Sequence, residues 1–200
     1  QFGGQTPLRI ANKLKEYGYK ILGTSFDAID ISEDRERFQK LIEKVGLKQP
    51  KSDISLGTKE LISKSSKLNF PILLRPSYVL GGRMMEKMNT LEDVQSYIDQ
   101  NYWALENNVI LIDEFLKEAK EVDVDILRDK DGNTMIAGIM EHIEEAGIHS
   151  GDSACCIPPF SLSNEIINSI KIFSKNLANE LGTVGLMNVQ YAIKDNEVYI

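Results

Sequence analysis

The residues best suited to chemistry begin directly after an apolar run, Phe70–Leu74. There Arg75-Pro-Ser-Tyr-Val-Leu-Gly-Gly-Arg83 places two arginines and a glycine pair in one short stretch. Planar guanidinium groups suit phosphate or carboxylate oxygens, and Gly81 and Gly82 let backbone N–H groups approach an anion closely. The stretch fits neither GxxxxGK[ST] nor GxGxxG. It predicts an anion-binding loop, with a tight hairpin carrying two solvated arginines as the alternative.

A second candidate is the connector Asp113–Glu121, which leaves the apolar run Val109–Ile112. Backbone groups at the end of a buried strand can bind a flat heterocycle, and an acid a few residues later can accept from ribose hydroxyls. The alternative is an ordinary charged surface connector.

A third candidate, Glu144–Ser153, is small, polar and interrupted by glycine, which is typical of a functional loop. His142 and His149 are the only histidines, and the neighbouring cysteines form no CxxC pair. A zinc cluster is therefore not expected, and neither histidine lies beside a GxSxG motif.

Asn188-Val-Gln190 places two amides on an otherwise apolar strand pattern. Such an amide is usually satisfied within a core. Alternatively, its oxygen could bind a hard cation beside a nucleotide.

The composition limits the class of protein. The chain has 200 residues, 42% hydrophobic content and a formal net charge of -7, which together favour a globular protein and disfavour nonspecific nucleic-acid binding. No apolar run reaches the roughly 20 residues of a membrane span, and no signal peptide is expected. Adjacent Cys155 and Cys156 provide no disulfide framework, so a cytoplasmic, reducing location is expected.

The elements that must position these residues fall into two groups. In the first half, four helices are predicted: one from Thr6-Pro7, one capped by Ser32 and ending at Gly46, one from Thr58 to Leu68 and one from Thr90. Strands are predicted there over Tyr19–Gly23, 70–74 and 83–88. The second half predicts strands over 109–112, 122–126, 134–143, 185–193 and 197–200, with one long helix ending at Gly182. The fold class expected is α+β.

Several segments, in order along the chain, resemble the large chain of carbamoyl phosphate synthetases, in particular the ATP-grasp unit of its carboxyl-terminal half. The segments that carry the resemblance are Gly3–Leu8, Gly23–Ser25, Asp27–Asp30, Glu33–Phe38, Arg75–Arg83, Glu121–Asp125, Met140–Ile143, His149–Ala154 and Gly185–Gln190. Tyr78–Arg83 and His149-Ser-Gly151 are similar to the half that phosphorylates carbamate rather than the half that phosphorylates bicarbonate.

The resemblance implies an ATP-grasp fold of two lobes with mixed and antiparallel sheets, the nucleotide cleft between them, after the end of a Rossmann-like segment. The implied bounds are 1–31 for that segment, 32–107 for the small lobe and 108–200 for the large lobe. The large lobe is expected to be truncated, because the family's remaining metal ligands lie in an acidic segment beyond Ile200.

The resemblance also implies roles for individual residues. Arg75 and Arg35 would contact the phosphates or acyl phosphate and act in catalysis, and Gln190 would bind Mg²⁺ or Mn²⁺. Other positions implied to bind ATP are the lid glycines Gly81 and Gly82, the adenine connector Glu114 and Leu116, the ribose acceptor Glu121, and the loop Gly147, Ile148, His149 and Ser150.

The implied reaction is ATP-dependent phosphorylation of carbamate to carbamoyl phosphate, for arginine or pyrimidine biosynthesis. The implied partners are the rest of the large chain and a glutamine amidotransferase small chain. Two alternatives remain: another ATP-grasp ligase, such as a biotin carboxylase or a purine-pathway carboxylating enzyme, and a nucleotide-binding module without turnover. As an isolated segment, the chain is expected to turn over little or not at all.

Overall fold

The computed structural model describes residues 8–76, 84–146 and 153–200, and the side chains of Arg9 and Arg35 are outside that description. Its contacts divide the chain into two compact units. Unit 1 comprises Gln1–Lys48, Lys120–Ile143 and Ala154–Ile200, and unit 2 comprises Gln49–Ala119 and Glu144–Ser153. Each unit is described by itself.

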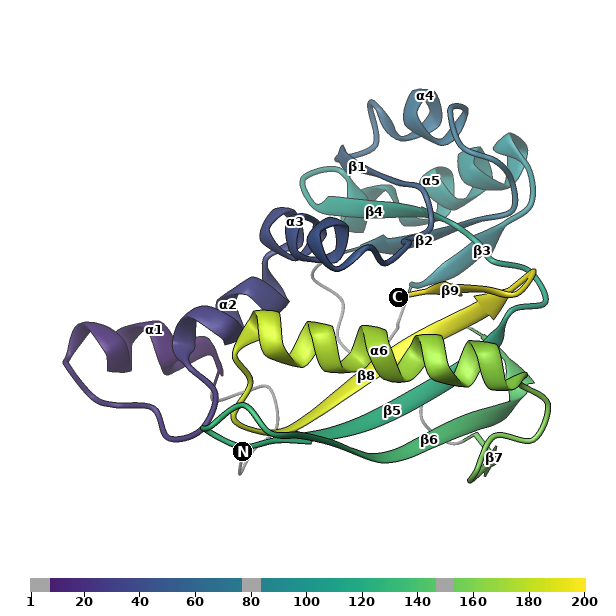
Figure 1. Ribbon diagram of the computed structural model, residues 1–200. Coiled ribbons are helices and arrows are strands. Elements are labelled where there is room, and N and C mark those ends of the chain that lie inside the picture. Colours follow the sequence, from purple (N-terminus) through teal and green to yellow (C-terminus); the bar gives the residue numbers. More distant parts are fainter. Residues whose placement is uncertain (1–7, 77–83, 147–152) are drawn as a thin grey trace. The chain divides into compact units, whose positions relative to one another are not determined.

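Unit 1 contains a sheet in which β5, β6, β7, β8 and β9 lie in the order β7-β6-β5-β8-β9 (Figure 1). Its strands are β5 (Lys120–Arg128), β6 (Thr134–Glu145), β7 (Cys155–Cys156), β8 (Gly185–Lys194) and β9 (Glu197–Tyr199), and its helices are α1 (Leu8–Glu16), α2 (Phe26–Glu33), α3 (Arg35–Val45) and α6 (Asn164–Leu181). The last two residues of β6 belong to unit 2.

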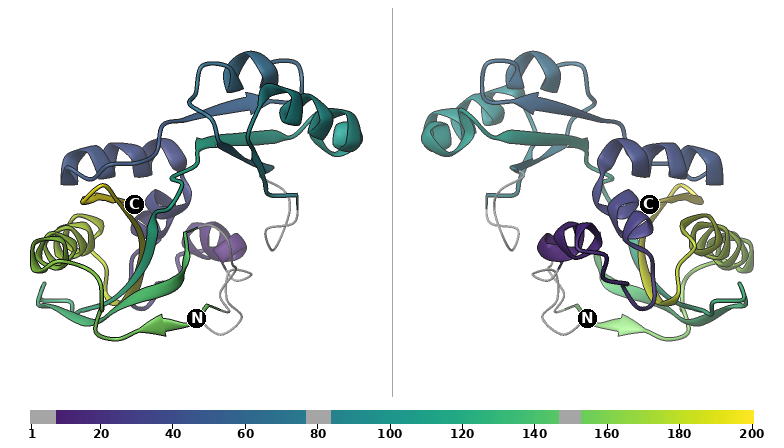
Figure 2. Two further views of the ribbon diagram at one scale, coloured as in Figure 1. Left: turned by 90° about the vertical axis from the view of Figure 1, so that its right-hand side faces the viewer. Right: turned by 90° about the vertical axis from the view of Figure 1, so that its left-hand side faces the viewer.

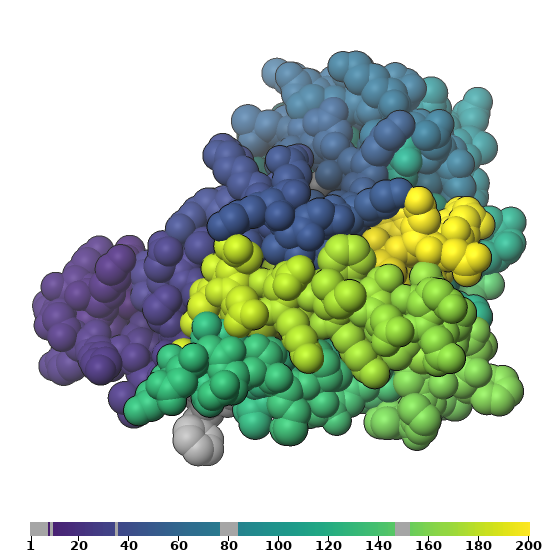
Figure 3. All heavy atoms as spheres, in the orientation of Figure 1, coloured from purple at the N-terminus to yellow at the C-terminus, as the bar shows by residue number. Residues whose placement is uncertain are grey.

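Helix α6 covers one face of this sheet, as Figures 1 and 2 show. Val122, Val124 and Ile126 alternate along β5 and are fully buried, and they share a core cluster with Ile170 and Leu177 of α6. A strand alternates its side chains between two faces, so the intervening residues of β5 lie on the face opposite α6. Helix α3 packs beside α6, which Figure 3 shows in space-filling form.

Unit 2 contains an antiparallel sheet with the order β1-β4-β2-β3. Its elements are β1 (Ser52–Leu56), α4 (Leu61–Ser65), β2 (Ile72–Pro76), β3 (Glu86–Met88), α5 (Leu91–Leu105) and β4 (Val109–Glu114). Leu61 of α4 and Val94 of α5 are fully buried in one cluster with Ile72, Leu74 and Ile112. Both helices therefore cover the same face of this sheet.

Most of the elements predicted from sequence are present. Gly46 and Gly182 end α3 and α6 in the left-handed conformation, and Thr90 and Asp93 form a capping box at the start of α5. Asp195 and Asn196 both have positive φ in the turn between β8 and β9. The antiparallel second half is confirmed by the pairing of β5 with β8.

Four local predictions were wrong or incomplete. Residues 19–23 form no strand, and Leu22 is 87% exposed. Asp34, not Ser32, caps α3, because Ser32 lies within α2 and donates to the Ala28 carbonyl. The helix expected over 58–68 is only Leu61–Ser65, and strand β1, rich in serine, was missed.

The boundaries between the two units differ from the segment bounds implied by the resemblance, which lie between residues 31 and 32 and between residues 107 and 108. Helix α3 packs on α6 in unit 1, while β4 lies between β1 and β2 in unit 2. The bounds expected for the family's segments stay a prediction.

Candidate functional site

The face of the unit 1 sheet that α6 does not cover carries a group of polar side chains. We call it the polar face, and it consists of Glu121, Asp123, Asp125, His142, Asn188 and Gln190. Its acids come from β5, where they alternate with the buried valines described above. The alternation Glu-Val-Asp-Val-Asp therefore builds the core on one side and a surface of hydrogen-bond acceptors on the other.

Two contacts order the polar face. His142 Nε2 lies 2.9 Å from Asp123 Oδ2, and these side chains are only 9% and 17% exposed. Asn188 Nδ2 donates to Asp125 Oδ1 at 3.0 Å. An amide that donates to a carboxylate has its orientation fixed, which turns the Asn188 carbonyl oxygen away from Asp125.

Glu121 and Gln190 lie diagonally from each other on the polar face. Glu121 is opposite Ala192 in the pairing of β5 with β8, and Asp123 is opposite Gln190. Diagonal neighbours on one face of a sheet are about 7–8 Å apart, which is within reach of a single small ligand. The structure thus brings together the predicted ribose acceptor and the predicted metal ligand.

Gln190 fits the role of an oxygen ligand. It is exposed on the polar face, and its amide has no hydrogen-bond partner within residues 8–76, 84–146 and 153–200. In the same part of the chain, no three His, Cys, Asp or Glu side chains are grouped so that they could hold a metal ion.

Arg75 lies on β2 of unit 2 and is held by Asp113 of β4. Arg75 Nε and Nη2 donate to Asp113 Oδ2 at 2.9 and 2.6 Å. The Arg75 side chain is 45% exposed and that of Asp113 15% exposed. The carboxylate thus orients the guanidinium group from one edge, while the group stays accessible to an anion.

The predicted adenine connector follows β4 in unit 2. The Glu114 carboxylate accepts hydrogen bonds at 2.9 Å from both the backbone N–H and the side-chain amide of Asn69. The Glu114 side chain is therefore engaged within unit 2, and its backbone N–H donates to the Lys51 carbonyl, so a nucleotide contact through the backbone of this connector stays a prediction. Leu116 is half-buried, and the ring of Phe115 lies 4.7 Å from the Lys87 ammonium nitrogen.

Several predicted residues are outside the description. Arg35 is the first residue of α3, but its side chain is not described. The other predicted residues outside the described ranges are Gly81, Gly82, Gly147, Ile148, His149 and Ser150.

Sequence reasoning gave no role to Asp113, Asp123 or His142. The sequence places Asp113 directly after the apolar run Val109–Ile112, which could have indicated a carboxylate at the end of a buried strand. The structure pairs this strand with the strand of Arg75. The strand over 122–126 was predicted, but the contact of Asp123 with His142 depends on the order of the strands in the sheet.

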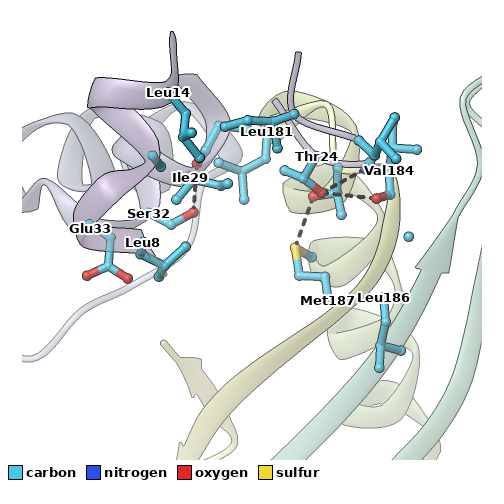
Figure 4. Close-up of a pocket in the computed structure, with 17 residues that line it drawn as sticks. Leu8, Leu14, Thr24, Ile29, Ser32, Glu33, Leu181, Val184, Leu186 and Met187 are labelled. Atoms are coloured by element: carbon cyan, nitrogen blue, oxygen red, sulfur yellow. Dashed lines mark hydrogen bonds between the residues drawn. The ribbon is translucent and has the colours of Figure 1, made fainter. Parts of the chain in front are cut away.

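A separate pocket of about 570 Å³ lies in unit 1 (Figure 4). Its lining is mainly apolar and includes Leu8, Leu14, Leu181, Leu186 and Met187. None of the residues predicted to bind ATP lines it, so this pocket is not the candidate site.

Two further findings concern the thiols and the helices. Cys155 and Cys156 are both free, with Cys155 exposed. Among the described residues, no helix is both long and apolar enough to cross a membrane.

Residues 34–200 match the family model of the carbamoyl-phosphate synthase L chain, ATP binding domain. The chain is 50% identical over 200 residues to the carbamoyl phosphate synthase large chain of Myxococcus xanthus, and 52% identical over 200 residues to that of Archaeoglobus fulgidus. In both cases the match covers 100% of this chain and 18% of the relative.

Solved structures of low sequence identity share the fold. An N5-carboxyaminoimidazole ribonucleotide synthetase in complex with ADP matches 96% of this chain and 49% of its own, with a TM-score of 0.76 at 21% identity. A biotin carboxylase from Campylobacter jejuni matches 99% and 46%, with a TM-score of 0.76 at 14% identity. The fold is therefore ATP-grasp, as expected from the sequence.

Proposed function

Because this chain belongs to the family of carbamoyl-phosphate synthase large-chain ATP-binding domains, we propose that it binds ATP for the phosphorylation of carbamate. The chain spans 18% of the length of the relatives named above, so the activity belongs to the whole large chain. The observation that carries the proposal is the polar face, where Glu121 and Gln190 lie as diagonal neighbours on β5 and β8.

In the proposed reaction, a carbamate oxygen attacks the γ-phosphorus of ATP. A new oxygen–phosphorus bond forms, the bond from the γ-phosphorus to the β,γ-bridging oxygen breaks, and ADP leaves. Carbamate is already an anion, so no side chain needs to remove a proton. The work of the protein is to align the two anions and to neutralise the charge that develops between them.

Individual residues supply these tasks. Arg75, oriented by Asp113, would bind phosphate oxygens, and Arg35 would add a second positive charge. Glu121 would accept from the ribose hydroxyls, and Leu116 and the backbone of Glu114 would lie beside the adenine. Gln190 would hold Mg²⁺ or Mn²⁺, which would neutralise phosphate charge when bound. Gly81, Gly82 and the residues Gly147, Ile148, His149 and Ser150 would complete the nucleotide site.

The assignment to the carbamate half rests on Tyr78–Arg83 and His149-Ser-Gly151. The rest of the large chain and a glutamine amidotransferase small chain would together supply carbamate. The product would serve arginine or pyrimidine synthesis in the cytoplasm.

The test replaces Arg75 with alanine in the full-length large chain. Arg75→Ala should depress carbamoyl phosphate formation from carbamate by roughly a hundredfold, the scale of losing one charge-stabilising donor. ATP synthesis from carbamoyl phosphate and ADP should fall alongside it.

The matched control is Arg37→Ala, since Arg37 lies on α3 and forms ion pairs with Asp27 and Asp30. This variant should keep both activities. Near-normal rates in both directions for Arg75→Ala would instead favour a purely structural ion pair of Arg75 with Asp113.

A further inference from the structure

Glu141 is a buried carboxylate on the face of the unit 1 sheet that α6 covers. It lies on β6, and only 6% of the residue is exposed. One oxygen, Oε2, accepts hydrogen bonds at 2.8 Å from the backbone N–H groups of both Phe160 and Ser161. The other oxygen, Oε1, accepts from the Ser161 hydroxyl group. The segment that leads into α6 is thus tied to β6 through one side chain.

The same group of contacts reaches β5. Lys120, the first residue of β5, donates to the Ser161 hydroxyl oxygen, and its ammonium nitrogen lies 4.0 Å from Glu141 Oε1. Burial alone would raise the pKa of Glu141, but the hydrogen bonds from Ser161 and Phe160 and the charge of Lys120 lower it. Glu141 is therefore an anion that holds β5, β6 and the start of α6 together.

The neighbours of these residues in sequence lie on the polar face. Glu121 follows Lys120, and His142, which contacts Asp123, follows Glu141. Successive residues of a strand point to opposite faces, so a shift of the backbone at Lys120 or Glu141 moves the side chains of Glu121 and His142 directly. Hydrogen bonds behind a site commonly fix the groups in front of it in this way.

We propose that Glu141 is a positioning residue for the nucleotide site, and that it acts from the opposite face of the sheet through Lys120 and Ser161 on Glu121 and His142. This inference rests on the proposed function, because it deepens the account of the same site. The inference predicts that substitutions of Glu141 weaken nucleotide binding, although a nucleotide on the polar face does not contact Glu141.

The experiment measures ATP synthesis from carbamoyl phosphate and ADP by the full-length large chain, with KM for ADP and kcat determined separately. Loss of folded protein lowers the apparent kcat but leaves the KM of the remaining molecules unchanged. A change in KM therefore separates positioning from stability.

Glu141→Gln should raise KM for ADP by about tenfold, the lower end of the effect for residues that orient binding groups. Ser161→Ala removes the hydroxyl group that donates to Glu141 and accepts from Lys120, and it keeps the carboxylate and both backbone hydrogen bonds. It should raise KM for ADP by about fivefold, within the range of a net hydrogen-bond contribution. Ser161→Thr keeps a hydroxyl group and should restore the wild-type value. Glu43→Gln is the matched control, because Glu43 is exposed on α3 and its carboxylate accepts from the exposed Gln39 of the same helix.

Each outcome is decisive. A lower kcat with KM unchanged in both Glu141→Gln and Ser161→Ala would overturn the inference and leave Glu141 a purely structural residue. If Glu141→Gln does not fold, Ser161→Ala and Ser161→Thr decide the question alone. A wild-type chain without this back reaction would instead overturn the proposed function.

Discussion

At the scale of single residues, Glu121 combines a position on the polar face with a predicted contact to ribose. Glu121→Ala should weaken nucleotide binding by about 1–3 kcal/mol, the range for losing a charged or buried hydrogen-bond partner. In the full-length large chain, bicarbonate-dependent ATP hydrolysis should persist while ATP synthesis from carbamoyl phosphate and ADP is lost.

The control for this prediction is Glu36→Ala, since Glu36 is an exposed residue of α3 that pairs with Lys40. The opposite pattern, with bicarbonate-dependent hydrolysis lost and the back reaction kept, would assign this chain to the other half of the large chain.

Tyr191 provides a prediction on the pH dependence of stability. Its ring is buried beneath α6, its hydroxyl group lies 2.9 Å from that of Ser174, and burial raises its pKa to about 12. The folded state therefore keeps the proton that the unfolded state begins to lose near pH 10. The contribution is complete below pH 10 and is lost as the pH rises through the folded pKa, to a total of about 2–3 kcal/mol.

The measurement is urea unfolding at several pH values between 9 and 12. The wild-type chain should lose more stability over this range than Tyr191→Phe, which has no proton to release. Equal slopes would contradict the assignment of this titration to Tyr191.

At the scale of elements, Gly57 joins β1 to α4 in a conformation that only glycine accepts easily. Its φ is +72°, and a Cβ atom would lie 2.1 Å from the carbonyl oxygen of Glu106. Gly57→Ala should therefore destabilise unit 2 by more than about 3 kcal/mol, because the backbone at residue 57 and the C-terminal end of α5 at Glu106 would both have to move.

Gly46 is the matched control at the end of α3. Its φ is +76°, but nothing lies within 4 Å of the added Cβ atom, so Gly46→Ala should cost only about 1 kcal/mol. Thermal unfolding followed by circular dichroism compares the two variants. Equal effects would show that the contact with Glu106 is relieved without cost.

The elements also show how far sequence reasoning reaches. Capping residues located the start of α5 at Thr90 and the end of α6 at Gly182, and periodicity located β5 and β8. These patterns signal an end or the buried face of an element. They failed at β1, where Ser55 is fully buried and its hydroxyl group donates to the Gly57 carbonyl. Nothing local distinguishes such a serine from one in a loop, since its hydrogen bond depends on the tertiary structure.

The same limit applies to the site. Glu121 and Gln190 were chosen from a resemblance, and only the register of β5 with β8 places them on one face. Glu141 was not chosen at all, because a glutamate within an apolar strand shows its role only when Ser161, 20 residues later, returns to it.

At the scale of the whole molecule, unit 2 owes most of its structure to one continuous segment. Residues 49–119 contain its whole described sheet, both helices α4 and α5 and the buried cluster around Ile72 and Ile112. We expect a peptide of residues 49–119 to fold by itself, with marginal stability for its size.

The measurement is thermal unfolding together with amide hydrogen exchange. A cooperative transition, with the slowest exchange in the central strands β4 and β2, is the expected result. A peptide without a transition would show that Glu144–Ser153 is needed to complete unit 2.

Unit 1 is built in the opposite way, and this has a consequence for the order of folding on the ribosome. Ile200 N–H donates to the Lys48 carbonyl, and the Thr24 hydroxyl group bonds both the N–H and the carbonyl of Val184. Residues 8–48 therefore leave the exit tunnel well before the residues they pack against have been translated. Their apolar side chains stay exposed in the nascent chain until those partners are made, and chaperones that bind such segments would meet α1 to α3 before the rest of unit 1.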